Sequence, residues 1–278
     1  MPCLLIVGLP LWAPRAGTPP LAIGSLSVTR WAALRLALAL AALACSAAPA
    51  PTTTTSVLAV SSTSAPVATS LTPSSSVTIS AGAPVTFPTG DGLTLEGRVF
   101  GAGDVFVVLA HMRTSSMESW FSFAEDLAEA GFSALPFNFR GYGASEGDGF
   151  AVDTDVVAAI DFAVSLGAER VFVVGASMGG TGAVAAAAQR PLAGVVVLSA
   201  PSVFEGVDAV AAASSVTVPI TLLAGQDDDG YPEEARAIGA AAAGPTDVRI
   251  VPSGAHGTNL LVDMGEGMRD LIINKVSD

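Results

Sequence analysis

The stretch VFVVGASMGGTGAVAAAA, from Val171 to Ala188, decides how the rest of the sequence is interpreted. An uninterrupted apolar run ends at Val174, and an alanine-rich run follows from about Gly180. This change predicts a buried strand that turns directly into a helix. Ser177 lies in the turn, with a glycine two residues before it and another two residues after it. The stretch therefore predicts either a plain tight turn or a turn that exposes a reactive hydroxyl.

Runs of these two kinds alternate from about residue 85 to the C-terminus. An early alternating strand is predicted after the TGDG turn, and the later apolar runs predict strands that are buried on both faces. The predicted strands span 93–100, 105–110, 132–138, 170–175, 194–200, 220–225 and 247–251. Helical spacing of apolar residues predicts helices over 117–131, 152–167, 179–190, 204–214, 232–242 and 257–276. This alternation predicts an α/β fold with a doubly wound, mostly parallel sheet and helices on both faces.

Composition limits the classes of partner. The chain has 278 residues, of which 51% are hydrophobic, and this is enough for one α/β domain with a sizeable core. Its formal net charge is −13 at pH 7. An acidic surface repels nucleic acid and anionic lipid, so neither is expected as a direct partner. We expect the domain to be a monomer.

The first 84 residues differ in composition from the rest. Residues 30–45 carry two arginines, then an apolar run that is too short to span a bilayer, then Cys45, and this pattern predicts a signal region over 1–45. The ALAC sequence resembles the lipobox of bacterial lipoproteins, in which Cys45 would carry the lipid; ordinary cleavage without a lipid is the alternative. Residues 46–84 lack charge and are rich in Ser, Thr, Ala and Pro, which predicts a flexible linker before a domain over 85–278. We therefore expect export, with membrane attachment only through a lipid on Cys45.

Cysteine and histidine usage gives no indication of a metal site or a cofactor. The two cysteines, Cys3 and Cys45, both precede the predicted domain, so no disulfide is expected within it. The two histidines, His111 and His256, are far apart in the sequence, and no cluster has the spacing of zinc ligands.

A serine hydroxyl needs a base before it becomes a useful nucleophile. His256 fits this role, because it lies in the glycine-rich loop PSGAHGTN between the last predicted strand and the last helix. The segment GQDDDGYP follows the preceding strand and offers Asp227, Asp228 and Asp229 as the acid that orients the base. The backbone N–H of Met178, at the start of the helix, would face a developing oxyanion.

These motifs resemble those of the α/β hydrolases. GASMG is similar to the nucleophile elbow of that family, LAHMRTSSMESW to its oxyanion loop and FRGYGASEG to its RGxGxS loop. The similarity of GQDD to the family's acid turn implies that Asp228 is the acid, with Asp227 and Asp229 as alternatives. Met112 stands where the family often has glycine, so the second oxyanion N–H is expected from Met112 or Arg113.

The resemblance also assigns the remaining polar residues of these loops. It implies that His111 organises the oxyanion loop, with contact to substrate as the alternative. Arg140 and Tyr142, in the RGxGxS-like loop, are expected to be structural.

The resemblance implies an enzyme without a cofactor that cleaves small carboxylic esters through Ser177, Asp228 and His256. The connection over 201–218 is too short to hold a cap domain, which favours an open site and short acyl groups. Peptidase, thioesterase and lactonase activity would use the same residues. A surface module that keeps the fold only to bind a partner is the alternative from another class.

Overall fold

The computed structural model describes residues 82–278 of the chain. The predicted signal region, with Cys45, and the linker up to residue 81 lie outside the described residues. The first strand begins at Ala83, two residues before the predicted start of the domain. None of the helices from residue 82 onward is both long enough and apolar enough to cross a membrane.

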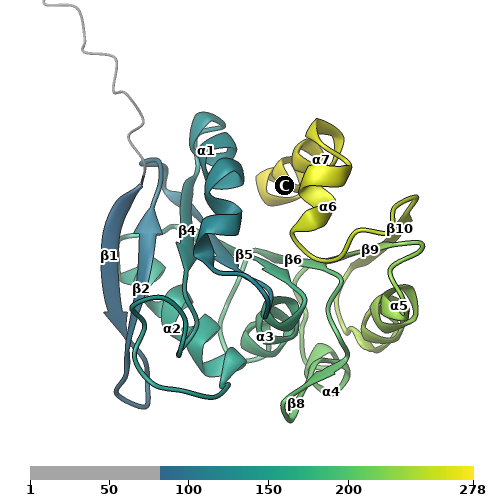
Figure 1. Cartoon of the computed structure of the whole chain (residues 1–278), viewed down its shortest axis with the longest axis horizontal. Helices are drawn as coiled ribbons and strands as arrows, with labels where there is room; N and C mark the ends of the chain where they lie inside the picture. Colours follow the sequence, from purple (N-terminus) through teal and green to yellow (C-terminus); the bar gives the residue numbers. More distant parts are fainter. Residues whose placement is uncertain (1–81) are drawn as a thin grey trace, which may run out of the picture. The chain divides into compact units, whose positions relative to one another are not determined.

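One sheet organises the described residues, with its strands in the order β1-β2-β4-β3-β5-β6-β9-β10 (Figure 1). β2 is antiparallel to both of its neighbours, and all the other pairs are parallel. The strands are β1 (Ala83–Pro88), β2 (Thr94–Val99), β3 (Val105–Ala110), β4 (Ser133–Phe137), β5 (Arg170–Ala176), β6 (Gly194–Leu198), β9 (Ile220–Gly225) and β10 (Thr246–Val251). The predicted mostly parallel, doubly wound sheet is confirmed.

Helices cover both faces of this sheet (Figure 1). They are α1 (Phe121–Glu129), α2 (Val152–Ser165), α3 (Met178–Ala187), α4 (Ala209–Ala213), α5 (Tyr231–Ala241), α6 (Asn259–Asp263) and α7 (Glu266–Ser277). One apolar core lies between the sheet and α2, α3, α4 and α5, and a second lies between the sheet and α1, α6 and α7. Every residue of β6 and β9 is buried, as predicted from their continuous apolar runs.

The segment after β6 differs from the helix predicted over 204–214. It forms a small hairpin of β7 (Val203–Phe204) and β8 (Val207–Asp208), and only then the short helix α4. Glu205 and Gly206 join the two strands, and both have positive φ angles, 46° at Glu205 and 86° at Gly206. Such a two-residue turn matches the twist of a hairpin, whereas it would interrupt a helix. The connection between β6 and β9 contains no further element, so it holds no cap domain.

Two predicted helices are divided. The segment from residue 117 begins with the 3₁₀ turn η1 (Met117–Trp120) before α1 continues it. The C-terminal segment breaks at Gly265, whose φ of 57° lies in the left-handed region, so α6 and α7 are separate helices. The break lets each short helix turn its own apolar side chains toward the sheet.

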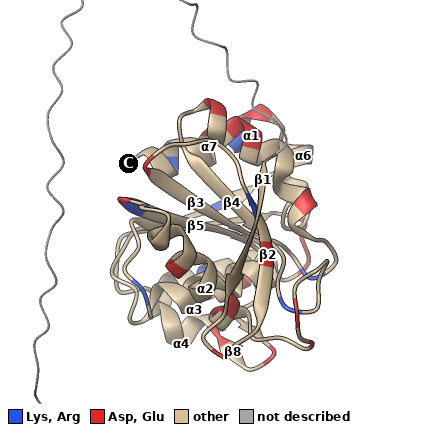
Figure 2. Ribbon diagram, turned by 90° about the vertical axis from the view of Figure 1, so that its left-hand side faces the viewer, with Lys and Arg blue, Asp and Glu red and all other residues tan. Residues whose placement is uncertain are grey.

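Acidic side chains outnumber basic ones in the described residues (Figure 2).

A buried ion pair fixes one loop beside the sheet. Arg140 follows β4, and its guanidinium donates to both carboxylate oxygens of the fully buried Asp155 in α2. A second carboxylate, Asp91, lies 2.8 Å from the same guanidinium. Removing one partner of such a buried pair leaves an uncompensated charge, so Arg140 is a structural residue, as predicted.

Candidate active site

Ser177 occupies a strained turn between β5 and α3. Its φ is 50° and its ψ is −120°, a conformation that residues with a side chain rarely adopt. Three backbone hydrogen bonds hold it there: its N–H donates to the carbonyl of Leu198 at 2.8 Å, and its carbonyl accepts from Gly180 and Thr181. The backbone at Ser177 is therefore neither helical nor extended, and the residue as a whole is largely buried.

The two glycines around Ser177 are required by space. A Cβ atom on Gly175 would lie 2.6 Å from the carbonyl carbon of Gly179. A Cβ atom on Gly179 would lie 2.7 Å from the carbonyl oxygen of His111. Real Cβ atoms are essentially never found so close to backbone atoms. The motif thus allows the tight turn, and it brings the start of α3 against the oxyanion loop that follows β3.

His256 and Asp228 meet at the same edge of the sheet, from the loops after β10 and β9. The Nδ1 atom of His256 lies 3.0 Å from one carboxylate oxygen of Asp228 and 3.1 Å from the other. The N–H of Gln226 donates to the carbonyl of Val251 at the end of β10, and the N–H of Asp227 donates to the carbonyl of Ser253 in the loop after it, so the two segments are fixed to each other. When Nδ1 carries the proton and donates it to Asp228, Nε2 is free to accept a proton from a nucleophile.

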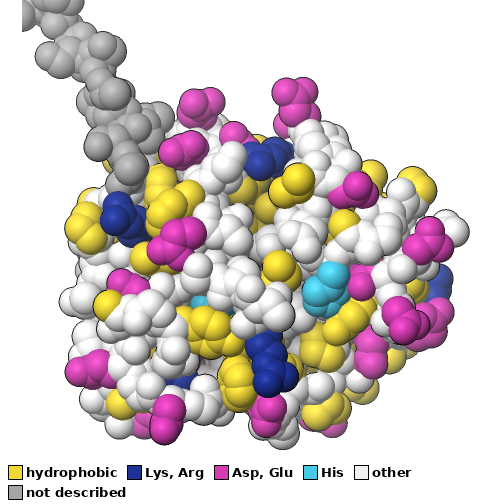
Figure 3. Space-filling model, in the orientation of Figure 1, with side chains coloured by type: hydrophobic (Ala, Val, Ile, Leu, Met, Phe, Trp, Pro, Cys, Tyr) yellow, Lys and Arg dark blue, Asp and Glu magenta, His cyan; other side chains and the backbone are white. Residues whose placement is uncertain are grey.

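The structure places only one of the three adjacent aspartates beside the base. Asp228 is 7% exposed and faces His256, whereas Asp227 and Asp229 are exposed to solvent. The imidazole itself is partly exposed, and Figure 3 shows an exposed histidine with hydrophobic and acidic side chains beside it. This arrangement leaves the His256 imidazole accessible from outside while the carboxylate of Asp228 is buried.

The other histidine, His111, holds the loop that follows β3, which is the predicted oxyanion loop. His111 is fully buried; its Nδ1 lies 2.8 Å from the carbonyl of Met112, and its Nε2 accepts the N–H of Phe139 at 3.3 Å. Burial lowers the pKa of His111 to about 4, although the bond to the Met112 carbonyl acts in the opposite direction. The proton of the neutral ring is therefore on Nδ1, which donates to that carbonyl. With no exposed surface, His111 has the position expected of a loop organiser.

Met112 and Met178, the expected sources of the oxyanion N–H groups, lie on two neighbouring segments. Met178 is the first residue of α3, so its N–H belongs to the first turn, where amides have no partner within the helix. Met112 follows His111, and its side chain packs against Gly257, the residue after His256. A Cβ atom added to Gly257 would lie only 3.0 Å from the Met112 sulfur. Arg113, the alternative donor, points its guanidinium over the ring of Phe150 at 5.4 Å. The carbonyl of Arg113 accepts a hydrogen bond from Tyr142 at 2.8 Å, which gives Tyr142 a structural role.

Sequence reasoning missed Tyr231, the first residue of α5. Its ring centroid lies 4.3 Å from that of His256, and its N–H donates to the carbonyl of Asp228. Burial and the nearby charge of Asp228 raise the pKa of its phenol above the ordinary value. The signal was present in GQDDDGYP, because a tyrosine three residues after the acid lies on the same turn of chain. Its contact with His256 depends on tertiary structure.

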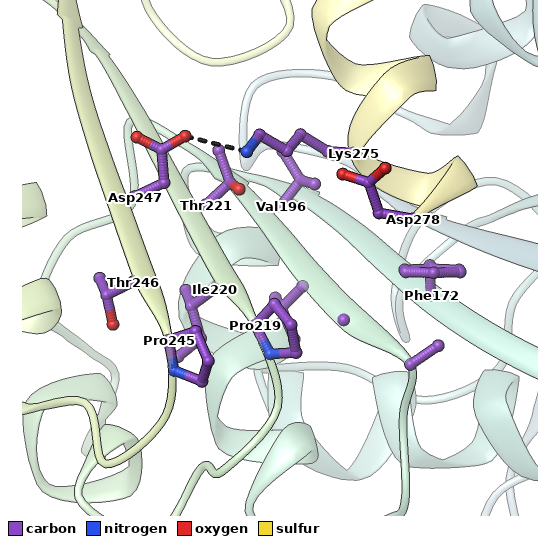
Figure 4. Close-up of a pocket in the computed structure, with 13 residues that line it drawn as sticks. Phe172, Val196, Pro219, Ile220, Thr221, Pro245, Thr246, Asp247, Lys275 and Asp278 are labelled. Carbon is purple, nitrogen blue, oxygen red and sulfur yellow. Dashed lines mark ion pairs between the residues drawn. The ribbon is translucent and has the colours of Figure 1, made fainter.

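A groove elsewhere on the domain is unrelated to these residues. It has a volume of about 280 Å³ and lies where β5, β6, β9 and β10 begin, against the end of α7 (Figure 4). Phe172, Pro219 and Pro245 line it, together with an ion pair of 3.0 Å between Lys275 and Asp247. Ligands of open α/β sheets bind beyond the opposite ends of the strands, where Ser177, Asp228 and His256 lie.

Comparison with known proteins identifies the fold. Residues 105–242 match the family described as "alpha/beta hydrolase fold". An esterase from Pyrococcus furiosus is 19% identical with a TM-score of 0.61, over 69% of this chain and 90% of that one. An esterase from Exiguobacterium antarcticum is 15% identical with a TM-score of 0.58, over 70% and 99%. An enol-lactonase from Burkholderia xenovorans is 16% identical with a TM-score of 0.60, over 70% and 100%.

No curated protein sequence matches this chain. The family match and the sheet order together show that the chain has the α/β-hydrolase fold, as the motifs in its sequence implied.

Proposed function

We propose that this protein is a serine hydrolase that cleaves carboxylic esters of small molecules. The observation that carries the proposal is the pairing of His256 with buried Asp228, on the edge of the sheet where Ser177 is held in a strained turn. A nucleophile, a base and an acid in this order along the chain are the parts that acyl transfer requires. The similarity in fold to two esterases and a lactonase agrees with this chemistry.

The proposed reaction has two halves. His256 takes the proton of Ser177 as the Oγ atom bonds to the acyl carbon, and it then gives this proton to the leaving alcohol. Water next attacks the acyl-enzyme with His256 as base, and the Ser177 oxygen leaves as the acid forms. Asp228 holds Nδ1 of the base and stabilises its positive charge. The N–H groups of Met178 and of Met112 or Arg113 stabilise the oxyanion of both tetrahedral intermediates.

A covalent probe tests this proposal directly. A fluorophosphonate should label the purified domain at Ser177, and the label should be absent from Ser177→Ala and strongly reduced in His256→Ala. Folded protein that stays unlabelled would instead support the surface binding module. p-Nitrophenyl esters, thioesters, lactones and peptides assayed side by side would then separate ester hydrolysis from the other reactions that the same residues perform.

We propose further that the protein is exported and that Cys45 carries a lipid anchor. The support is the sequence alone, in which basic residues and a short apolar run precede the ALAC motif. In a host that processes lipoproteins, Cys45→Ser should move the protein from the membrane fraction to the soluble one. Wild-type protein that is already soluble, with no acyl mass on its N-terminal peptide, would contradict the anchor.

A further inference from the structure

Arg113 forms no ion pair with any carboxylate of residues 82–278, although the chain is strongly acidic. The sequence holds 25 Asp and Glu residues against 12 Lys and Arg residues. Most of the described cations have a carboxylate partner: Arg140, Arg190, Arg236, Arg249, Arg269 and Lys275. A guanidinium without such a partner, among so many acids, is available to an anionic group from outside the chain.

The backbone of Arg113 is fixed beside the start of α3. The loop that carries it abuts that helix, because a Cβ atom on Gly179 would lie 2.7 Å from the carbonyl oxygen of His111. The hydroxyl of Tyr142 donates to the carbonyl of Arg113 at 2.8 Å and holds the loop from its other side. Arg113 therefore stands at the edge of the sheet where Ser177 lies.

Two aromatic rings direct the Arg113 side chain. Its guanidinium lies over the ring of Phe150, 5.4 Å from the centroid, and the ring of Phe204 meets Phe150 edge to face. Phe150 comes two residues before α2, which packs closely on α3: a Cβ atom on Gly182 would lie 2.7 Å from the Val152 carbonyl oxygen. The ring of Phe150 covers a face of the guanidinium, while the N–H groups, which lie in its plane, point outward from an exposed residue.

The charge at this position matches a carboxylate. A guanidinium presents a planar fork of N–H groups that binds the two oxygens of a carboxylate side by side. Arg140, in the neighbouring loop, adds no free charge, because it is buried and paired with both Asp155 and Asp91. One available guanidinium suits a singly charged group better than a doubly charged phosphate.

We propose that Arg113 determines the specificity of the site, with its guanidinium binding a carboxylate group of the substrate while Ser177 attacks the ester carbonyl. This inference rests on the proposed function, because it names the substrate class of the same site. The class consists of small esters that carry a carboxylate, such as half-esters of dicarboxylic acids. The acidic surface repels such an ester at long range, so the attraction that selects it is the local contact with Arg113.

Paired esters that differ only in one charge test the proposal. Mono-p-nitrophenyl adipate carries the carboxylate on the acyl part, and methyl p-nitrophenyl adipate is its neutral partner. 4-Acetoxybenzoate and its methyl ester form the same pair for the alcohol part. The measured quantity is the ratio of kcat/KM for the charged ester to kcat/KM for the neutral one. In Arg113→Gln this ratio should fall about tenfold or more in one pair, the size expected when a hydrogen bond to a charged group is lost.

The ratio isolates the guanidinium from the other effects of the substitution. A change at the backbone N–H of residue 113, or a smaller folded fraction, affects both esters of a pair equally and cancels. Arg113→Lys keeps the charge and loses the planar fork, so its ratio should lie between those of the wild type and Arg113→Gln. The pair in which the ratio falls shows which part of the substrate carries the carboxylate.

The chain offers a matched control in Arg170. Its guanidinium also lies over a phenylalanine ring, that of Phe172 at 5.0 Å, but Arg170 is the first residue of β5, at the end of the strand away from Ser177. Arg170→Gln removes the same charge and should keep the wild-type ratios within about twofold, because exposed charges at a distance are screened by salt. Unchanged ratios in Arg113→Gln for both pairs, or an equal fall in Arg170→Gln, would overturn the proposal.

Labelling by the fluorophosphonate separates this inference from the proposed function. If wild-type protein is not labelled at Ser177 and cleaves neither neutral ester, the proposed function fails, and the role of Arg113 fails with it. If it is labelled and cleaves the neutral esters, while Arg113→Gln keeps the wild-type ratios, only the inference about Arg113 fails.

Discussion

At the scale of single residues, burial distinguishes three aspartates that are adjacent in the sequence. The side chain of Asp228 is directed at His256 and almost completely buried, whereas its two neighbours are solvated. Only a carboxylate in contact with the imidazole can hold its tautomer and stabilise its positive charge. The chemical identity of the side chain is the same at all three positions, so its surroundings decide the role.

We predict that Asp228→Asn lowers kcat for ester hydrolysis by about 10⁴-fold, as found when the orienting acid of a triad is replaced. Asp227→Asn and Asp229→Asn are matched controls and should stay within about twofold, because exposed side chains contribute little. Steady-state assays with p-nitrophenyl butyrate would measure all three. A larger loss in either control than in Asp228→Asn would assign the acid to a different position.

The buried His111 predicts a pH dependence of stability. The pKa of His111 is about 4 in the folded protein, whereas its ordinary value is 6.5. Between these two pH values the unfolded chain therefore binds a proton at His111 that the folded chain does not bind. The free energy of unfolding is therefore unaffected by His111 above pH 6.5. It decreases as the pH falls toward 4, and His111 accounts for at most about 3 kcal/mol of this decrease.

Urea unfolding at pH 7.5 and pH 4.5 would measure this loss in the wild type and in His111→Gln. Carboxylates contribute equally to both proteins, so the loss between the two pH values should be smaller in the variant by about 2–3 kcal/mol. Equal losses in both proteins would contradict the assignment of a neutral, buried ring.

At the scale of elements, the turn that joins β5 to α3 through Ser177 depends on glycines, which have no side chain. The space for a side chain at Gly179 is taken by the carbonyls of the loop after β3. The same contact brings the loop that carries Met112 close to the start of α3. A glycine in this motif is thus a packing requirement between two elements as well as a local turn requirement.

We predict that Gly179→Ala destabilises the domain by about 1–3 kcal/mol and abolishes most activity, because the new methyl group must displace backbone. Gly267→Ala is the matched control, since a Cβ atom there meets nothing within 4 Å and Gly267 lies in α7. Alanine should stabilise that helix by up to about 1 kcal/mol. Urea unfolding and an esterase assay would compare them, and a fully active Gly179→Ala protein would disprove the packing argument.

At the scale of the whole molecule, the architecture leaves the candidate site without a cover. Between β6 and β9 the described chain holds only a hairpin and the short helix α4, so no inserted domain lies over Ser177. Phe150 and Phe204, whose rings meet edge to face with centroids 5.1 Å apart, come from the loop before α2 and from the hairpin. A few aromatic side chains of this kind give a shallow apolar wall.

An uncovered site predicts a preference for short acyl groups. Each buried CH₂ group contributes about 0.8 kcal/mol, and carbons that stay in water contribute almost nothing. The kcat/KM of p-nitrophenyl esters should therefore rise over the first few acyl carbons and then level off, with no increase in activity at an oil–water interface. Values that climb to about twelve carbons or beyond would require a buried acyl channel, given that contribution per CH₂ group.

The sequence alone predicted the α/β fold, because strand and helix periodicity and the glycine requirement of the Ser177 turn are local properties of the chain. It also placed Ser177 and His256 at the carboxyl ends of strands, since alternating elements force parallel pairing. It did not predict the hairpin after β6, where two positive φ angles at Glu205 and Gly206 override an alanine-rich pattern.

Tertiary structure decided which groups meet. The choice of Asp228 among three aspartates, the contact of Tyr231 with His256 and the tautomer of His111 each depend on loops that pack against one another from distant parts of the chain. The periodicity of apolar residues predicts whether a segment is a strand or a helix, and a motif predicts which kind of residue lies in the loop after it. The distance between two side chains on different loops is fixed only when the sheet has brought those loops together, which is why these three features could not be derived from the sequence.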